Sequence, residues 1–166
     1  MLKDEVALSK EKIKKLDIEP IIKSVVDDFN SLYKLKRGIN ISYKNDGKND
    51  YFIYGIENRI EQIVANLLDN AISFSDDKKD VIVQVSKSHD DKVYLKVLDE
   101  GQGFKEKDTN KIFKRFYSNR PDKFGQHYGR GLNIVKNLVD LHNATITASN
   151  RHDKKGASME IEFPKV

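Results

Sequence analysis

Residues 63–71 are Ile63-Val-Ala-Asn-Leu-Leu-Asp-Asn-Ala71, a stretch with two asparagines four positions apart. Apolar residues recur around them at helical spacing over about 56–74 and predict a helix with one core-facing side. Residues four apart lie one above the other, so the amides of Asn66 and Asn70 point the same way, opposite that side. Asparagine disfavours helix interiors, and its amide oxygen suits Mg²⁺. On the helix alone, a solvated face and a ligand site explain the pair equally well.

The composition places the chain in a broad class. Its 166 residues are 38% hydrophobic and 34% charged, which predicts one soluble globular domain. We find no apolar run long enough to cross a membrane and no signal-peptide pattern. Cysteine is absent, which excludes disulfides and cysteine-based zinc sites. The net charge of +4 is spread over isolated basic pairs, so we expect no nucleic-acid binding.

The flanking sequence predicts alternating helices and strands. A helix with Pro20 in its first turn ends at Gly38, and a further helix covers 131–142. Strands are expected near 39–43, 51–54, 81–86, 92–98, 146–148 and 159–163, with a short helix at 111–117. Strands 81–86 and 92–98 are too close for a crossover. We therefore predict an α+β fold, a two-layer α/β sandwich whose mixed, mostly antiparallel sheet is covered on one face by three main helices.

Two glycine-containing loops follow the asparagine helix. Asp99-Glu-Gly-Gln-Gly103 comes directly after a strand, where glycine lets backbone approach a ligand and Asp99 can accept from an adenine amino group. Gly125 to Leu132 opens a helix, whose backbone N–H groups can bind phosphate. This second loop has neither the Walker A nor the dinucleotide-binding pattern. Taken singly, a tight turn and a flexible hinge explain these loops as well as a ligand does.

Taken together, these elements resemble the catalytic ATP-binding domain of sensor histidine kinases, within the Bergerat-fold ATPase superfamily of gyrase B, Hsp90 and MutL. The matching segments are 63–71 (N box), 99–103 (G1 box), 111–117 (F box), 129–132 (G2 box) and the terminal strand 156–164. Residues 1–16 are rich in lysine and glutamate and look like the end of a helix. The resemblance covers 17–166, and it implies that residues 1–16 are a remnant of the dimerisation and phosphoacceptor hairpin, or a linker. Residues 116–121 and 124–129 are similar to ChvG/ExoS-type sensor kinases of alphaproteobacteria.

The resemblance implies a role for each matching residue at the adenine and the metal. Asn70 corresponds to the Mg²⁺ ligand, and Asn66 lies one turn before it, near the phosphates. Asp99 corresponds to the residue that recognises the adenine amino group. The residues implied to shape the adenine pocket are Phe74, Gly101 and Gly103.

Further matches concern the phosphates and the mobile lid over ATP. Phe113 and Phe116 correspond to the aromatic residues that support the lid. Either Arg115 or Arg120 is expected to meet the γ-phosphate as a catalytic cation. The remaining residues expected near the phosphates are His127, Gly129, Gly131 and Leu132. For His127, a polar loop residue without contact to ATP is the alternative.

Some positions depart from the common family pattern. Ser73 stands where many members have Lys or Arg, which puts one phosphate contact in doubt. Ser118 replaces an arginine that often follows the F box, and His127 replaces the first glycine of the G2 box. His89, His142 and His152 are expected to be surface or helix-end residues.

The residue one turn before Asn70 indicates the phosphate acceptor. ATP-hydrolysing members and anti-sigma serine kinases have a glutamate there as general base, whereas this chain has Asn66. A neutral amide cannot take up a proton in that role, and a neutral imidazole needs less activation than a hydroxyl. We therefore expect transfer of the γ-phosphate of Mg-ATP to a histidine. The alternatives are a serine kinase or anti-sigma switch of the same fold, and a non-catalytic nucleotide-binding module.

The acceptor itself is not expected within this chain. None of its four histidines has the His-Glu/Asp context of the family's phosphorylated residue. We expect the acceptor on a separate dimerisation hairpin, in cis or in trans, with a response regulator downstream. The chain itself is expected to be a monomeric, cytoplasmic domain of an inner-membrane sensor protein.

Overall fold

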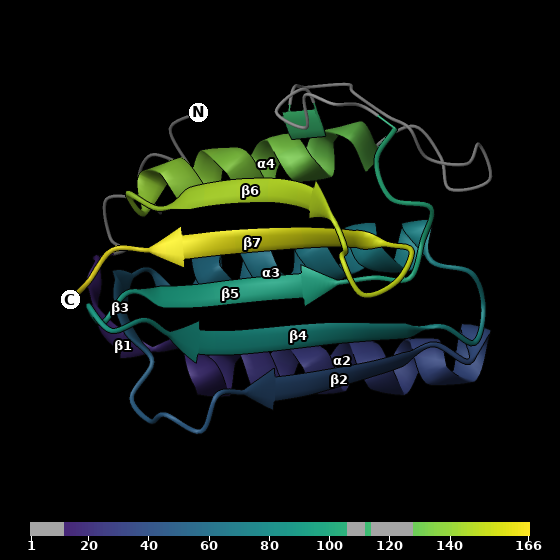
Figure 1. Ribbon diagram of the computed structural model, residues 1–166. Coiled ribbons are helices and arrows are strands. Elements are labelled where there is room, and N and C mark those ends of the chain that lie inside the picture. The colour runs from purple at the N-terminus through teal and green to yellow at the C-terminus, as the bar shows by residue number, and fades with distance from the viewer. Residues whose placement is uncertain (1–11, 106–111, 114–127) are drawn as a thin grey trace, which may run out of the picture.

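The computed structural model describes residues 12–105, 112–113 and 128–166, without the side chains of 128–130. The described residues form three helices and two sheets (Figure 1). The helices are α2 (Ile18–Arg37), α3 (Glu57–Phe74) and α4 (Tyr128–Leu141). The strands are β1 (Lys14–Asp17), β2 (Asn40–Asn45), β3 (Phe52–Gly55), β4 (Asp80–Lys87), β5 (Val93–Leu98), β6 (Thr145–Asn150) and β7 (Ala157–Phe163).

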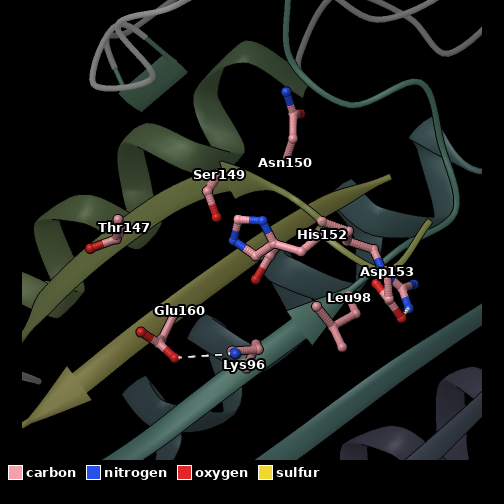
Figure 2. A pocket seen from close by; sticks show the side chains of 10 residues that line it. Lys96, Leu98, Thr147, Ser149, Asn150, His152, Asp153 and Glu160 are labelled. Atoms are coloured by element: carbon pink, nitrogen blue, oxygen red, sulfur yellow. Dashed lines mark hydrogen bonds and ion pairs between the residues drawn. The ribbon is translucent and has the colours of Figure 1, made fainter. Parts of the chain in front are cut away.

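The main sheet has five strands in the order β2-β4-β5-β7-β6. Only β2 and β4 run parallel; β4–β5 pair antiparallel, as their close spacing predicted, and β5–β7 and β6–β7 are antiparallel as well. All three helices lie on one face (Figure 1), which confirms the predicted two-layer sandwich. The opposite face is open, and the outward side chains of β5, β6 and β7 line a cavity of about 430 Å³ there (Figure 2).

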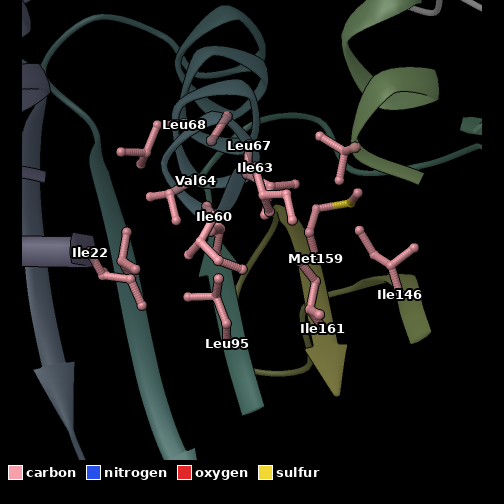
Figure 3. Packing of buried hydrophobic residues seen from close by; sticks show 14 of the residues in the cluster. Ile22, Ile60, Ile63, Val64, Leu67, Leu68, Leu95, Ile146, Met159 and Ile161 are labelled. Atoms are coloured by element: carbon pink, nitrogen blue, oxygen red, sulfur yellow. The ribbon is translucent and has the colours of Figure 1, made fainter. Parts of the chain in front are cut away.

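The core lies between the sheet and α3. Alternate residues of β4 and β5 are buried, as the period of a strand requires. They meet the apolar stripe of α3 (Figure 3), which confirms the predicted helical spacing. The buried members of that stripe include Ile60, Ile63, Val64, Leu67 and Leu68.

Both predicted ends of α2 are confirmed. The side chain of Asp17 caps its start by accepting from the N–H of Glu19 at 3.0 Å, and Pro20 lies in the first turn. Gly38 ends the helix with a left-handed φ of 66°, which glycine adopts without a Cβ penalty.

The start of the chain corrects one expectation. We expected residues 14–16 at the end of a helix, but they belong to β1, which pairs antiparallel with β3. Beyond this ladder, the N–H of Ile18 donates to Tyr51 O at 3.0 Å, and Leu16 is packed against the core. These long-range contacts outweigh the local helical pattern. The division of the chain at residue 17 stays a prediction, and residues 1–11 lie outside the described residues.

Two other boundaries follow from the structure. Helix α4 begins at Tyr128, earlier than the predicted residue 131, and of the predicted 111–117 helix only 112–113 are described. No helix within the described ranges combines the length and apolarity that crossing a membrane needs.

Candidate nucleotide site

The asparagine helix is covered on the side that we expected to be polar. Asn70 and Ser73 are each only 3% exposed, whereas Asn66 is half-buried. This side is therefore not a solvated face at Asn70 or Ser73, and α4 packs on the same helix. Ser73 Oγ donates to Asn70 O at 2.9 Å. The serine hydroxyl is therefore engaged with its own helix.

Asp99 lies where β5 ends and is 2% exposed. Its Oδ1 accepts from the N–H of Gly101 at 2.9 Å and of Ala157 at 3.0 Å. Burial raises the pKa of Asp99 above its ordinary value, although these two bonds and the charge of Arg151 act in the opposite direction. No hydrogen bond from a described residue reaches Oδ2. The carboxyl group is thus held rigidly and can accept another donor.

The two glycines of this loop are required by close contacts. A Cβ at Gly101 would lie 2.5 Å from Phe74 O and 3.2 Å from Asp99 Oδ1. Gly103 has a φ of +77°, and a Cβ there would lie 2.6 Å from the side-chain oxygen of Asn150. The loop therefore packs directly on the end of α3.

The end of α3 is held by a residue that sequence reasoning missed. Arg37 donates to Ile72 O at 2.7 Å and to Ser75 O at 2.5 Å, and it pairs with Asp77 at 2.7 Å. These bonds satisfy carbonyl groups at the helix end. Ser75 Oγ is the one buried side-chain polar atom in the described part of the chain without a hydrogen-bond partner. Such an orphan beside Phe74 fits a site that a ligand or a water completes.

The lid side of the site is described only in part. Phe113 is 6% exposed, and its carbonyl accepts from Asn133 of α4 at 3.4 Å, so the first F-box aromatic packs near α4. Leu132 is buried, and a Cβ at Gly131 would meet no atom within 4 Å. Gly129 lies in the first turn of α4. The predicted site residues outside the described ranges are Arg115, Phe116, Arg120 and His127.

The structure thus places Gly101 of the G1 loop against Phe74 at the end of α3, and α4 packs on α3. None of the predicted ligand residues within the described ranges lines the cavity on the open face of the sheet. Sequence reasoning also missed Asn150 and Arg151, which touch the G1 loop from the β6–β7 hairpin. No local pattern marks them, because their partners lie far away in the chain. His142, expected at a helix end, is buried there and accepts from Ile56 N–H at 3.2 Å.

Comparison with known proteins agrees with this arrangement. The family "Histidine kinase-, DNA gyrase B-, and HSP90-like ATPase" matches residues 55–166. The sensor protein ChvG of Agrobacterium fabrum is 34% identical over 155 residues, which are 89% of this chain and 26% of that protein. ChvG of Rhizobium meliloti is 30% identical over 163 residues, 94% of this chain and 28% of that protein. The chain therefore spans about a quarter of the length of these relatives.

Solved structures show the same fold. The catalytic domain of the histidine kinase ThkA superposes with a TM-score of 0.79 at 24% identity, covering 93% of this chain and 96% of that one. With the family match over 55–166 and ChvG sensor kinases as relatives, the chain belongs to the histidine kinase-, DNA gyrase B- and HSP90-like ATPase family.

Proposed function

We propose that this domain binds Mg-ATP and transfers the γ-phosphoryl group to a histidine on a separate dimerisation hairpin. The observation that supports this acceptor is Asn66, which stands one turn before Asn70 on α3. In ATP-hydrolysing members of the superfamily and in anti-sigma serine kinases, a glutamate at that position serves as general base for water or a serine hydroxyl. An amide cannot accept that proton, whereas a neutral imidazole nitrogen has a lone pair ready to attack.

Adenine recognition is assigned to Asp99. Its Oδ1 is occupied by two backbone N–H groups, which leaves Oδ2 for the amino group of the base. The absence of side chains at Gly101 and Gly103 lets the loop approach both α3 and the ligand. Phe74 is half-buried beside this loop and is assigned to contact the base.

The residues also fit a magnesium ion bound mainly through the nucleotide. No group of three or more His, Cys, Asp or Glu side chains among the described residues could hold a metal alone. Mg²⁺ commonly binds through few protein oxygens together with phosphate and water, and an amide oxygen such as that of Asn70 suits it. When bound, the ion neutralises charge on the phosphates. Asn70 is the residue assigned to hold it.

The metal assignment is tested by titrating a non-hydrolysable ATP analogue with and without Mg²⁺. In Asn70→Ala, we expect the Mg²⁺-dependent part of the affinity to be lost. The exposed Asn137→Ala on α4 is the matched control and should keep it. An Asn70→Ala variant that binds the Mg²⁺ complex as tightly as wild type would refute the role of Asn70.

The acceptor is tested with radiolabelled ATP and the dimerisation hairpin of a ChvG relative supplied in trans. We expect label on the hairpin that is lost in acid and retained in alkali, as a phosphohistidine behaves. Acid-stable label would instead indicate the serine kinase alternative. Tight ATP binding without any transfer would favour the non-catalytic module.

The wider setting belongs to the same proposal. The relatives are sensor proteins, and ThkA has been solved in complex with the response regulator TrrA. These comparisons support a place for this domain in a longer membrane sensor, on its cytoplasmic side, with a response regulator as the final phosphate acceptor. The separated domain is proposed to be monomeric.

A further inference from the structure

We propose that Arg151 is a positioning residue that holds Asp99 in the orientation required to select adenine over guanine. The inference rests on the proposed nucleotide site. Arg151 follows β6, whereas Asp99 follows β5, and 52 positions separate them. Arg151 Nη1 donates to the main-chain oxygen of Asp99 at 3.0 Å. Its side chain is 3% exposed, and the bond to Asp99 is partly buried.

The guanidinium is itself held by a second contact. Arg151 donates from Nε to Asp153 Oδ1 at 3.0 Å and from Nη2 to Oδ2 at 2.8 Å. Such a two-bond fork fixes the plane of the guanidinium and adds directional specificity. The N–H of Arg151 also donates to Gly156 O at 2.9 Å and closes the turn. The arginine is therefore preset toward Asp99 before any ligand binds.

The same hairpin holds the G1 loop at other points. The N–H of Asp99 donates to Ala157 O at 3.0 Å, and Ala157 N–H returns to Asp99 Oδ1 at 3.0 Å. A Cβ at Gly156 would lie 2.0 Å from Asp99 O, so only glycine permits this approach. Farther along the loop, Asn150 accepts from Phe104 N–H at 2.6 Å and donates to Phe104 O at 3.1 Å. Both ends of the loop are thus held from the β6–β7 hairpin.

The hairpin reaches the loop from outside the proposed ligand pocket. Asn150, Arg151 and Asp153 are among the residues that line the cavity on the open face of the sheet. Arg151 contacts the main chain of Asp99 and leaves Oδ2 unoccupied. Its effect on the nucleotide is therefore indirect, through the position and the charge of Asp99.

Charge gives the inference a signature that packing alone would not produce. Burial raises the pKa of Asp99, the positive charge of Arg151 lowers it and the negative charge of Glu100 raises it. Glu100 is itself engaged with the N–H of Asp80 at 2.7 Å and with Lys154 at 3.3 Å. Without the arginine, the pKa of Asp99 rises further, so its carboxylate is lost at a higher pH. Nucleotide affinity should fall as Asp99 becomes protonated. A protonated Oδ2 would present a hydrogen to the adenine amino group, whereas the Oδ2 of the carboxylate only accepts.

The experiment measures the dissociation constants of ATP and GTP for the whole chain across a series of buffers from neutral to acidic. For Arg151→Gln we expect the preference for ATP over GTP to fall about tenfold, the value of one misplaced hydrogen bond of about 1.4 kcal/mol. We also expect ATP affinity to begin its acid decline at a higher pH than in wild type. Arg151→Lys keeps the positive charge, so its ATP affinity should begin to decline at the same pH as in wild type. Only part of the preference for ATP over GTP should return.

Controls separate the possible failures. Lys155→Gln neutralises an exposed cation on the same turn and should match wild type in both readouts. If Arg151→Gln does not fold, Asp153→Asn loosens the fork at a carboxylate that is 65% exposed, and it should lower the preference for ATP. A folded variant with unchanged preference and unchanged acid decline overturns the inference. A wild-type protein that fails to bind ATP overturns the proposed function instead.

Discussion

The close approach of Gly101 to the main chain of Phe74 predicts that Gly101→Ala impairs nucleotide binding. The added Cβ would lie 2.5 Å from Phe74 O and 3.0 Å from the carbonyl carbon of Phe74. Both atoms are main chain, so no side-chain rotation can relieve the clash. Gly101 does not have a positive φ, which means that the effect of alanine is steric and not a matter of backbone conformation.

The magnitude follows from these distances. Phe74 O and the new Cβ must separate by about 0.9 Å to reach an ordinary contact of 3.4 Å. A shift of this size in a packed interior costs about 1–3 kcal/mol of folding free energy. It also displaces Asp99, whose Oδ1 accepts from the N–H of Gly101. Loss of one charged hydrogen bond to adenine costs about 1.5–3 kcal/mol of binding free energy, which raises the dissociation constant of ATP roughly 10- to 100-fold.

Calorimetric titration with a non-hydrolysable ATP analogue measures this loss, and urea unfolding measures the stability. Gln102→Ala changes the exposed neighbour in the same loop and is the matched control, expected to bind as wild type does. The reasoning is refuted if folded Gly101→Ala binds the analogue within about twofold of wild type, because the loop would then tolerate the displacement that we derive.

Three further predictions concern stability, each measured by urea unfolding. Arg37→Gln removes hydrogen bonds to the end of α3 and should lower the free energy of unfolding by roughly 1.5–3 kcal/mol. A loss below about 0.5 kcal/mol would show that Arg37 does not stabilise this helix end. Leu95→Ala, at 0% exposure, should cost about 2–5 kcal/mol, whereas Leu35→Ala, at 90% exposure, should stay within about 0.5 kcal/mol; equal losses would contradict the assigned core. Burial pushes the pKa of Asp46 upward, but hydrogen bonds from Tyr51 and from main-chain N–H groups outweigh it and lower the pKa below 3.8. Stability from this carboxylate is therefore present above pH 3.8 and lost as pH falls through the folded pKa, so Asp46→Asn should flatten that acid decline; an unchanged decline would contradict the linkage.

Much of the fold could be predicted because its signals are local. Alternation in 81–86 and 92–98 and the helical spacing around residues 63–71 each depend on neighbours a few residues away. Pro20 and Gly38 marked the first turn and the end of α2 for the same reason. The prediction failed at residues 14–16, where a charged, helix-like pattern forms β1, because its ladder partner β3 lies about 40 residues away.

The candidate site likewise has features that the sequence shows and features that depend on how the elements pack. The sequence by itself determined which residues are available for chemistry: two amides one turn apart, a carboxylate at a strand end, and glycines where backbone must come close. Only the tertiary structure decided that Asn70 is buried, that Gly101 meets Phe74, and that Arg151 reaches Asp99. The physical reason is that residue spacing along one element sets which side chains share a face, whereas burial and long-range hydrogen bonds exist only once separate elements have packed together.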